Sequence, residues 1–160
     1  MDKDNNDECI SIINNIDINE PSYILFHDGY MGTQAQINFN GFLQRPHSFD
    51  WIGDGFDELV VPYTLKDTLF IRIINQKGKI LKDIPLFSGT ARIDSSGVFP
   101  WKGIVQSILY ADLNKDGMKE LIVFPDESFA RSPRGVYVYH GQTFQLLSKF
   151  EMGPRIKKLK

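Results

Sequence analysis

The stretch "ADLNKDGMKELIV" (residues 111–123) places four oxygen-bearing side chains around one glycine and continues directly into an apolar run. The four side chains and the glycine are Asp112, Asn114, Asp116, Glu120 and Gly117. The closing run is aliphatic and β-branched, which is typical of a strand. We therefore predict a polar loop that leads into a β-strand. The pattern alone leaves three functions open for this loop: a calcium site, an acid/base site or a polar turn.

The same pattern occurs three times along the chain. When the segments are aligned on the acid that precedes each apolar run, "DLNKDGMKELIV" (112–123) matches "DWIGDGFDELVV" (50–61), and both match "DKDNNDECISI" (2–12). Asp112 and Asp50 are position 1 of their loops, and 62 residues separate them. A repeat of this length, built from short strands, is the period of a propeller blade.

The rest of the chain also consists of short strand-like segments. They are "YILFHDG" (23–29), "DELVVPY" (57–63), "TLFIRII" (68–74), "GIVQSILY" (103–110), "KELIVFP" (119–125) and "GVYVYHG" (135–141). No capped stretch of a dozen residues has the apolar spacing of an amphipathic helix. We predict an all-β protein, a segment of about three blades of a β-propeller built from short antiparallel strands. Its predicted parts are a partial blade at 1–42, a second blade at 43–95 and a third at 96–160.

The spacing of the oxygen-bearing residues fits the coordination chemistry of calcium. Calcium takes six to eight hard oxygen ligands, which a tight loop supplies from alternate side chains and one backbone carbonyl. The predicted ligands of the third loop are Asp112, Asn114, Asp116, the carbonyl of Met118, and Glu120. The corresponding ligands are Asp50, Asp54, Phe56 and Glu58 in the second loop, where Ile52 stands at position 3, and Asp2, Asp4, Asn6 and Glu8 in the first.

Position 6 of the loop requires a positive φ at the sharp turn. Glycine adopts such angles freely and asparagine tolerates them, so Gly117, Gly55 and Asn5 fit one geometry. An EF-hand shares the first half of the pattern but needs a bidentate glutamate at position 12. Val123 stands there, inside a strand-like run. The sequence therefore predicts a calcium loop that is followed by a strand, and it argues against an EF-hand.

These residues carry a family resemblance. The pattern D-x-[DN]-x-D-G-x-x-E before an apolar strand, followed by "RGVYVYHGQ" (134–142), resembles the FG-GAP/VCBS repeats of integrin-α-like β-propellers and of many microbial surface proteins. The resemblance implies a calcium loop between the first two strands of each blade. It also implies an extracellular, cell-surface or periplasmic location.

Charge and composition limit the kinds of partner that the chain can be expected to bind. The formal charge of −2 and the pI of about 5.9 provide no basic face for nucleic acid. A single cysteine, Cys9, excludes a disulfide within the chain. No apolar run approaches the roughly 20 residues of a membrane helix, and the acidic N-terminus does not resemble a signal peptide. We expect neither nucleic-acid binding nor a membrane span.

The sequence therefore predicts a binding or scaffold module, not itself an enzyme, in which calcium is structural. Its loops would contact protein or carbohydrate partners. Two alternatives remain: an accessory propeller of a larger enzyme, such as a polysaccharide lyase or hydrolase, and a ligand-sensing module. Because propellers close with four to eight blades, we expect further blades from the rest of a longer chain or from another chain.

Overall fold

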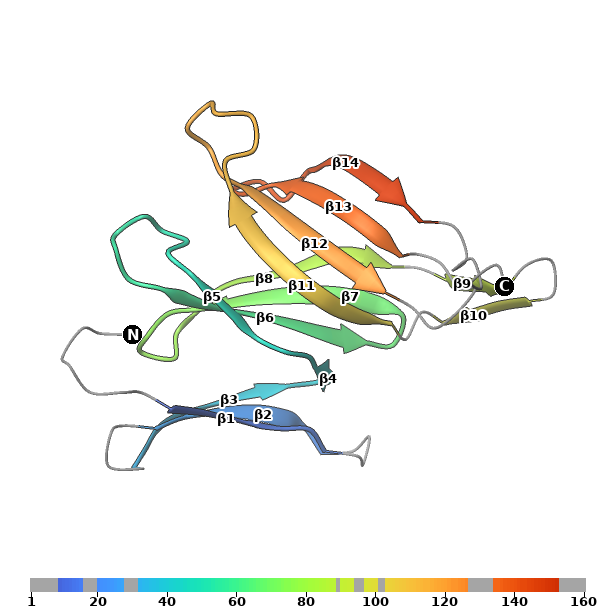
Figure 1. The fold of residues 1–160 in the computed structure, drawn as a ribbon. Coiled ribbons are helices and arrows are strands. Elements are labelled where there is room, and N and C mark those ends of the chain that lie inside the picture. The colour runs from blue at the N-terminus through green and yellow to red at the C-terminus, as the bar shows by residue number, and fades with distance from the viewer. Residues whose placement is uncertain are drawn as a thin grey trace, which may run out of the picture. The chain divides into compact units, whose positions relative to one another are not determined.

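The structure is a computed structural model that describes residues 9–15, 20–27, 32–88, 90–93, 97–100, 103–126 and 134–152. Within these ranges the secondary structure is entirely β-strand, which confirms the all-β prediction (Figure 1). The strands are β1 Cys9–Ile13, β2 Ser22–His27, β3 Thr33–Phe39, β4 Phe42–Leu43, β5 His47–Phe49, β6 Glu58–Leu65, β7 Thr68–Ile74, β8 Ile80–Ser88, β9 Thr90–Ile93, β10 Gly97–Pro100, β11 Ile104–Ala111, β12 Glu120–Asp126, β13 Gly135–His140 and β14 Leu146–Glu151. No helix that could cross a membrane is found in the described part of the chain.

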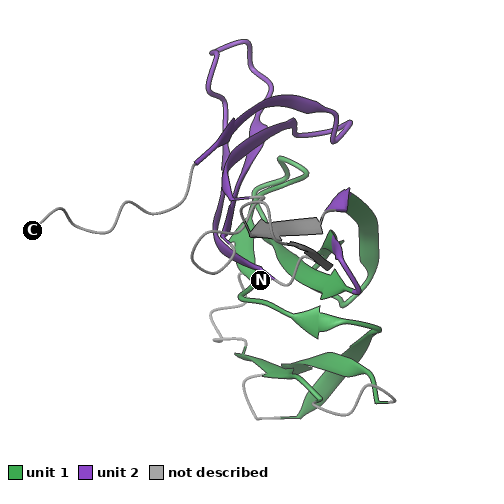
Figure 2. Cartoon of the chain, turned by 90° about the vertical axis from the view of Figure 1, so that its right-hand side faces the viewer, with its two compact units in different colours: residues 1–65, 69–85 green, residues 66–68, 86–160 purple. Residues whose placement is uncertain are grey.

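The chain forms two compact units (Figure 2). The first contains residues 1–65 and 69–85, and the second contains residues 66–68 and 86–160. All sheets are antiparallel, and neighbours in space are mostly neighbours in sequence. This connectivity requires only short turns between strands, which agrees with the many Gly, Asn and Asp residues between the apolar runs.

The first unit contains two sheets. The smaller has the order β1-β2-β3, and the larger has the order β4-β6-β7-β8, with β5 also paired to β6. Strands β5, β6, β7 and β8 therefore follow one another as a four-stranded meander. Strand β6 is buried on both faces along most of its length, because its apolar run "ELVVPY" does not alternate with polar residues.

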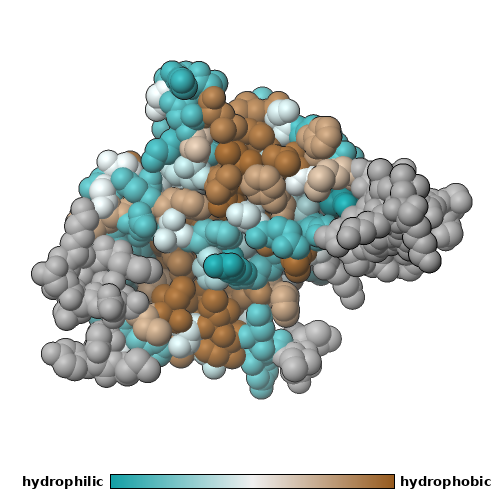
Figure 3. All heavy atoms as spheres, viewed as in Figure 1, coloured by the Kyte–Doolittle hydropathy of each residue, from teal (hydrophilic) through white to brown (hydrophobic). Residues whose placement is uncertain are grey.

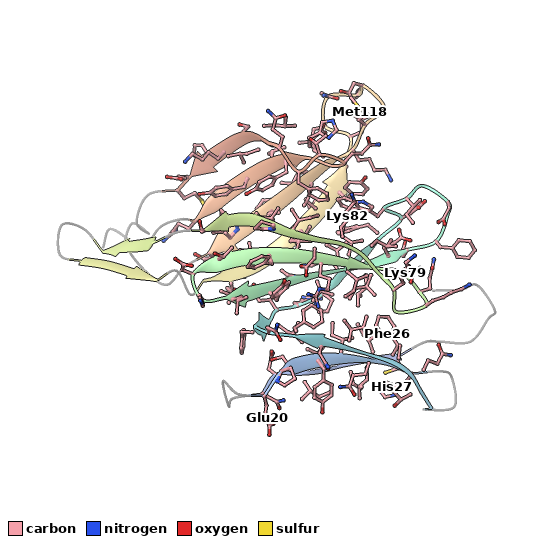
Figure 4. All side chains as sticks on the ribbon, turned by 180° about the vertical axis from the view of Figure 1, so that it is seen from behind. Glu20, Phe26, His27, Lys79, Lys82 and Met118 are labelled. Carbon is pink, nitrogen blue, oxygen red and sulfur yellow. The ribbon has the colours of Figure 1, made fainter. Side chains whose placement is uncertain are left out.

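A hydrophobic core joins the two sheets of the first unit. The buried side chains of the smaller sheet are Ile24, Phe26, Ile37 and Phe39, and they pack on Leu43, Leu59, Val61, Tyr63 and Ile74 of the larger sheet. Phe26 points from the smaller sheet toward the larger one (Figure 4). Residues i and i+2 of a strand share a face, so alternation in β2 and β3 directs these side chains to one side.

A polar network covers the edge of this core. The guanidinium of Arg72 lies 4.3 Å from the ring centroid of Phe39, and its Nε donates to Asp83 Oδ2 at 3.1 Å. The Tyr63 hydroxyl donates to Asp83 Oδ1 at 2.8 Å. Burial, together with the neighbouring carboxylate, raises the pKa of Tyr63 to about 12. The network ties β6, β7 and β8 together.

The second unit contains the four-stranded sheet β11-β12-β13-β14 and the hairpin of β9 and β10. One face of the four-stranded sheet is buried and carries Leu121, Val123, Tyr137 and Tyr139. Phe87 stacks on Tyr137 with their ring centroids 5.4 Å apart. Burial raises the pKa of both tyrosines, and Glu151 adds to the effect at Tyr137.

Candidate metal site in two equivalent loops

The two repeated loops that lie within the described residues have the same place in their sheets (Figure 1). Residues 50–57 join β5 to β6, and residues 112–119 join β11 to β12. Each loop therefore connects the first two strands of a four-stranded meander. The loop of the first repeat, with Asp2, Asp4, Asn6 and Glu8, lies outside the described residues.

The aspartate at position 1 organises each loop by accepting backbone hydrogen bonds. Asp112 Oδ1 accepts from the N–H of Lys115 at 2.7 Å, and its Oδ2 accepts from the N–H of Gly117 at 2.9 Å. Asp50 accepts from the same two positions of its own loop, Gly53 at 2.7 Å and Gly55 at 3.1 Å. The chain thus folds around the carboxylate in both repeats.

The aspartate at position 5 makes a second tight turn. Asp116 Oδ1 accepts from the N–H of Met118 at 2.8 Å, and Asp54 Oδ1 accepts from the N–H of Phe56 at 3.0 Å. Position 3 differs between the loops. Asn114 bonds both the N–H and the carboxylate of Asp116, at 2.9 Å each, whereas Ile52 at the corresponding place is exposed.

Two positions in each loop have a left-handed backbone. Position 6 has φ of +86° at both Gly117 and Gly55, which confirms the positive φ predicted there. Position 4 also has positive φ, +83° at Gly53 and +63° at Lys115. The positive φ at position 4 was not predicted, because lysine carries no signal for this conformation. The glycine of the second loop was the available clue.

The glutamate at position 9 is the first residue of the strand that follows each loop, and it is buried. Glu58 is 0% exposed and Glu120 is 5% exposed. Glu120 Oε2 accepts from the N–H of Leu113 at 2.8 Å, and Glu58 Oε2 accepts from the N–H groups of Trp51 and Ile52 at 3.0 and 3.2 Å. The glutamate therefore ties the start of each loop to its end.

The two carboxylate oxygens of Glu58 differ in their hydrogen bonding. Glu58 Oε1 is buried and has no hydrogen-bond partner. A buried carboxylate oxygen without a partner is costly, because it has left water and gains no hydrogen bond in return. A cation bound beside it would remove this cost. The observation is independent of the spacing of the ligands in the sequence.

The side chains of the two loops offer the type of ligand atom that calcium prefers. Its side-chain members are carboxylates and one amide, which are hard oxygen donors. Each carboxylate has about four lone-pair sites, so accepting backbone N–H groups does not by itself exhaust its capacity. In the described part of the chain, however, no three His, Cys, Asp or Glu side chains come close enough to hold a metal ion by themselves. A bound cation would therefore need the amide, backbone carbonyls or movement of the side chains.

The structure brings the predicted ligands together within each loop. Asp112, Asn114, Asp116 and Glu120 are joined through hydrogen bonds to one loop backbone, and Met118 follows at its tip (Figure 4). Asp50, Asp54 and Glu58 are joined in the same way, with Phe56 beside them.

The turn after β13 supports the third loop. Gly141 donates its N–H to the carbonyl of Lys119 at 3.1 Å, and a Cβ on Gly141 would collide with that carbonyl. His140 Nδ1 accepts from the N–H groups of Gln142 and Thr143 at 3.2 and 3.3 Å. The segment "YHGQ" therefore has a structural role next to the loop, and its glycine is required by close approach of two backbones.

Comparison of this chain with protein-family models, with curated proteins and with solved structures finds no match.

Proposed function

We propose that the chain is a calcium-stabilised repeat module of the FG-GAP/VCBS type. Its four-stranded meanders act as propeller blades, and the loops between strands bind protein or glycan partners. In this proposal the metal is structural and the chain itself performs no reaction. An extracellular or periplasmic location would supply calcium at the concentrations that such surface loops require.

The observation that carries the proposal is the agreement between the two loops. Residues 50–58 and 112–120 share backbone hydrogen bonds to the acids at positions 1, 5 and 9 and share positive φ at positions 4 and 6. A generic polar turn would not need the same five features in two distant segments. The unpaired Oε1 of Glu58 supports a cation at the second loop.

The sheet topology supports the blade assignment. A propeller blade is a four-stranded antiparallel sheet, and β5 to β8 and β11 to β14 each have this form. Both loops lie between the first and second strands, as the family resemblance implies. Calcium would join residues from the two ends of a loop and so hold the first strand against the second.

Thermal unfolding of the full chain in chelator and in millimolar calcium tests the proposal. A metal that binds only the folded state at about 100 times its Kd stabilises by about 2.7 kcal/mol. For a chain of this size the Tm should rise by roughly 5–10 °C. Magnesium should raise it less, because it demands a smaller octahedral shell. Identical melting curves in chelator and calcium would contradict the proposal.

A pair of variants tests whether the calcium-induced rise in Tm comes from the loop at residues 112–120. Asp116→Ala removes a proposed ligand and should abolish at least half of the calcium-induced rise in Tm. Asp57→Ala removes one carboxylate at position 8 of the other loop, where the side chain is exposed, and should leave the rise intact. The comparison is the rise within each variant, so a lower baseline stability does not affect it. Equal losses in the two variants would exclude the ligand assignment.

A further inference from the structure

The loop of residues 112–119 extends beyond the ends of β11 and β12 and is exposed along most of its length (Figure 1). In the space-filling view it forms a largely hydrophilic projection (Figure 3). Two of its side chains are nevertheless large and apolar. Leu113 is 56% exposed, and Met118, at the tip, is 44% exposed (Figure 4). Neither side chain is a proposed metal ligand, since Met118 would contribute only its backbone carbonyl.

The same two positions are apolar in the second loop. Trp51 stands at position 2, as Leu113 does, and Phe56 stands at position 7, as Met118 does. The two side chains of the second loop are half-buried, whereas those of the third loop face water. One exposed apolar side chain is common on protein surfaces. Two of them in one polar loop, at positions that are half-buried in the other repeat, indicate a surface that they contact.

Both apolar residues are held by proposed metal ligands. The N–H of Leu113 donates to Glu120 Oε2 at 2.8 Å, and the N–H of Met118 donates to Asp116 Oδ1 at 2.8 Å. A cation bound to these carboxylates would fix the backbone at both residues. The two side chains would then be ordered before they meet a partner, which lowers the entropic cost of binding.

Calcium would also reverse the net charge of this loop. Residues 112–120 contain three acids and two lysines, for a net charge of −1, and one bound Ca²⁺ changes this to +1. Residues 50–58 contain four acids and no basic residue, so the same ion leaves that loop at −2. Of these two loops, the third alone becomes attractive to an anionic surface when calcium binds.

The proposed coordination shell leaves room for an oxygen from outside the chain. The loop offers five donor groups, whereas calcium takes six to eight oxygens. Phospholipid headgroups supply phosphate oxygens, which are hard ligands of the kind that calcium prefers, and the hydrocarbon layer lies directly below them. An anionic bilayer therefore offers an oxygen ligand and an apolar environment within reach of one loop.

We propose that the loop of residues 112–120 docks on anionic phospholipid membranes when it holds calcium, with Leu113 and Met118 inserted between the lipids. The ion bridges the loop carboxylates and a lipid phosphate. This inference rests on the proposed function, because the loop without calcium keeps its net negative charge. The docking is peripheral, so it needs no segment that spans the membrane.

Co-sedimentation of the full chain with vesicles tests the docking. Vesicles of phosphatidylcholine and phosphatidylserine should bind the parent in millimolar calcium and release it in chelator, and vesicles of phosphatidylcholine alone should bind it weakly. Leu113→Ser and Met118→Ser should each weaken binding about ten-fold, since each removes one inserted apolar side chain. Both variants keep the carboxylates and backbone groups of the loop, so calcium should still raise their Tm as it raises that of the parent.

Ile52→Ser is the matched control. Ile52 is 58% exposed in the loop that stays negatively charged, so its replacement should leave vesicle binding unchanged. Binding that persists in chelator, or that the two serine variants of the third loop leave unchanged, would overturn the docking by this loop. An equal loss in Ile52→Ser would overturn it as well.

The melting curves separate this inference from the proposed metal site. A parent whose Tm rises with calcium but that does not bind anionic vesicles would overturn the docking alone, and it would leave a protein partner for Leu113 and Met118. A parent that shows neither the rise in Tm nor vesicle binding would overturn the calcium site and the docking together.

Discussion

At the scale of single residues, a few backbone angles and one carboxylate oxygen define the candidate site. Gly55 and Gly117 share a φ of +86°, so the two loops turn in the same sense at the same position. The aspartates at position 1 then meet N–H groups that this turn directs toward them. Local geometry of this kind can be inferred from residue types, because it depends on neighbours within nine residues.

Replacing Gly117 separates this geometry from a generic turn. Nothing lies within 4 Å of a Cβ placed on Gly117, so a substitution meets strain in the backbone and no steric clash. Gly117→Val should destabilise the chain by about 1–3 kcal/mol, since β-branched residues are outliers at positive φ. Gly117→Asn should cost less, because asparagine tolerates this region. Urea unfolding measures both values, and equal stability of Gly117→Val and the parent would contradict the shared loop geometry.

His47 should make the stability depend on pH. Burial, with the nearby charge of Arg45, lowers its pKa below the usual 6.5. The unfolded chain then takes up the proton more readily than the folded one. The stability contribution of His47 is therefore unaffected above about pH 6.5 and declines as the pH falls below it, until the folded pKa is passed. His47→Phe should reduce the loss of unfolding free energy between pH 7.5 and pH 5, as measured by urea titration. An unchanged loss would exclude His47 as its source.

At the scale of elements, burial decides which strands can be predicted from the sequence. The predicted segments at 57–63, 68–74, 119–125 and 135–141 correspond to β6, β7, β12 and β13, which are central strands with many apolar residues. Strands β3, β8 and β14 were not predicted, nor were the short strands β4, β5, β9 and β10. All of them lie at sheet edges. The longer three mix polar or charged residues with apolar ones without a strong pattern, and the side chains of β14 are exposed throughout.

The contact between the third loop and the β13–β14 turn gives a prediction at this scale. Gly141→Ala would place a methyl group against the carbonyl of Lys119 and near the ring of Tyr110. Because the obstacle is backbone, the turn must shift, and we expect a loss of about 1–3 kcal/mol in unfolding free energy. Gln142→Ala, at an exposed site in the same turn, should change it by less than about 0.5 kcal/mol. Equal unfolding free energies for the two variants would show that the close approach does not constrain the turn.

At the scale of the whole molecule, repeats in the sequence become sheets, and the sheets combine into larger units. The sheets of the first two repeats share a hydrophobic core and belong to one compact unit. The sheet of the third repeat belongs to the other unit. Each sequence repeat corresponds to one group of strands. A compact unit, by contrast, is defined by the hydrophobic cores that adjoining sheets share. Such cores depend on contacts between residues far apart in the chain.

The sequence by itself determined the all-β class, the strands of the sheet centres and the positive φ at Gly117 and Gly55. These features depend on periodicity, β-branching and turn chemistry, all of which act over a few residues. Tertiary structure alone decided that Glu58 is wholly buried with one oxygen unpaired, that Gly141 approaches Lys119, and that Leu109 and Phe150 lie on the same side of their sheet. Each of these requires strands to pair in one register, and register is set by the packing of whole sheets rather than by neighbouring residues.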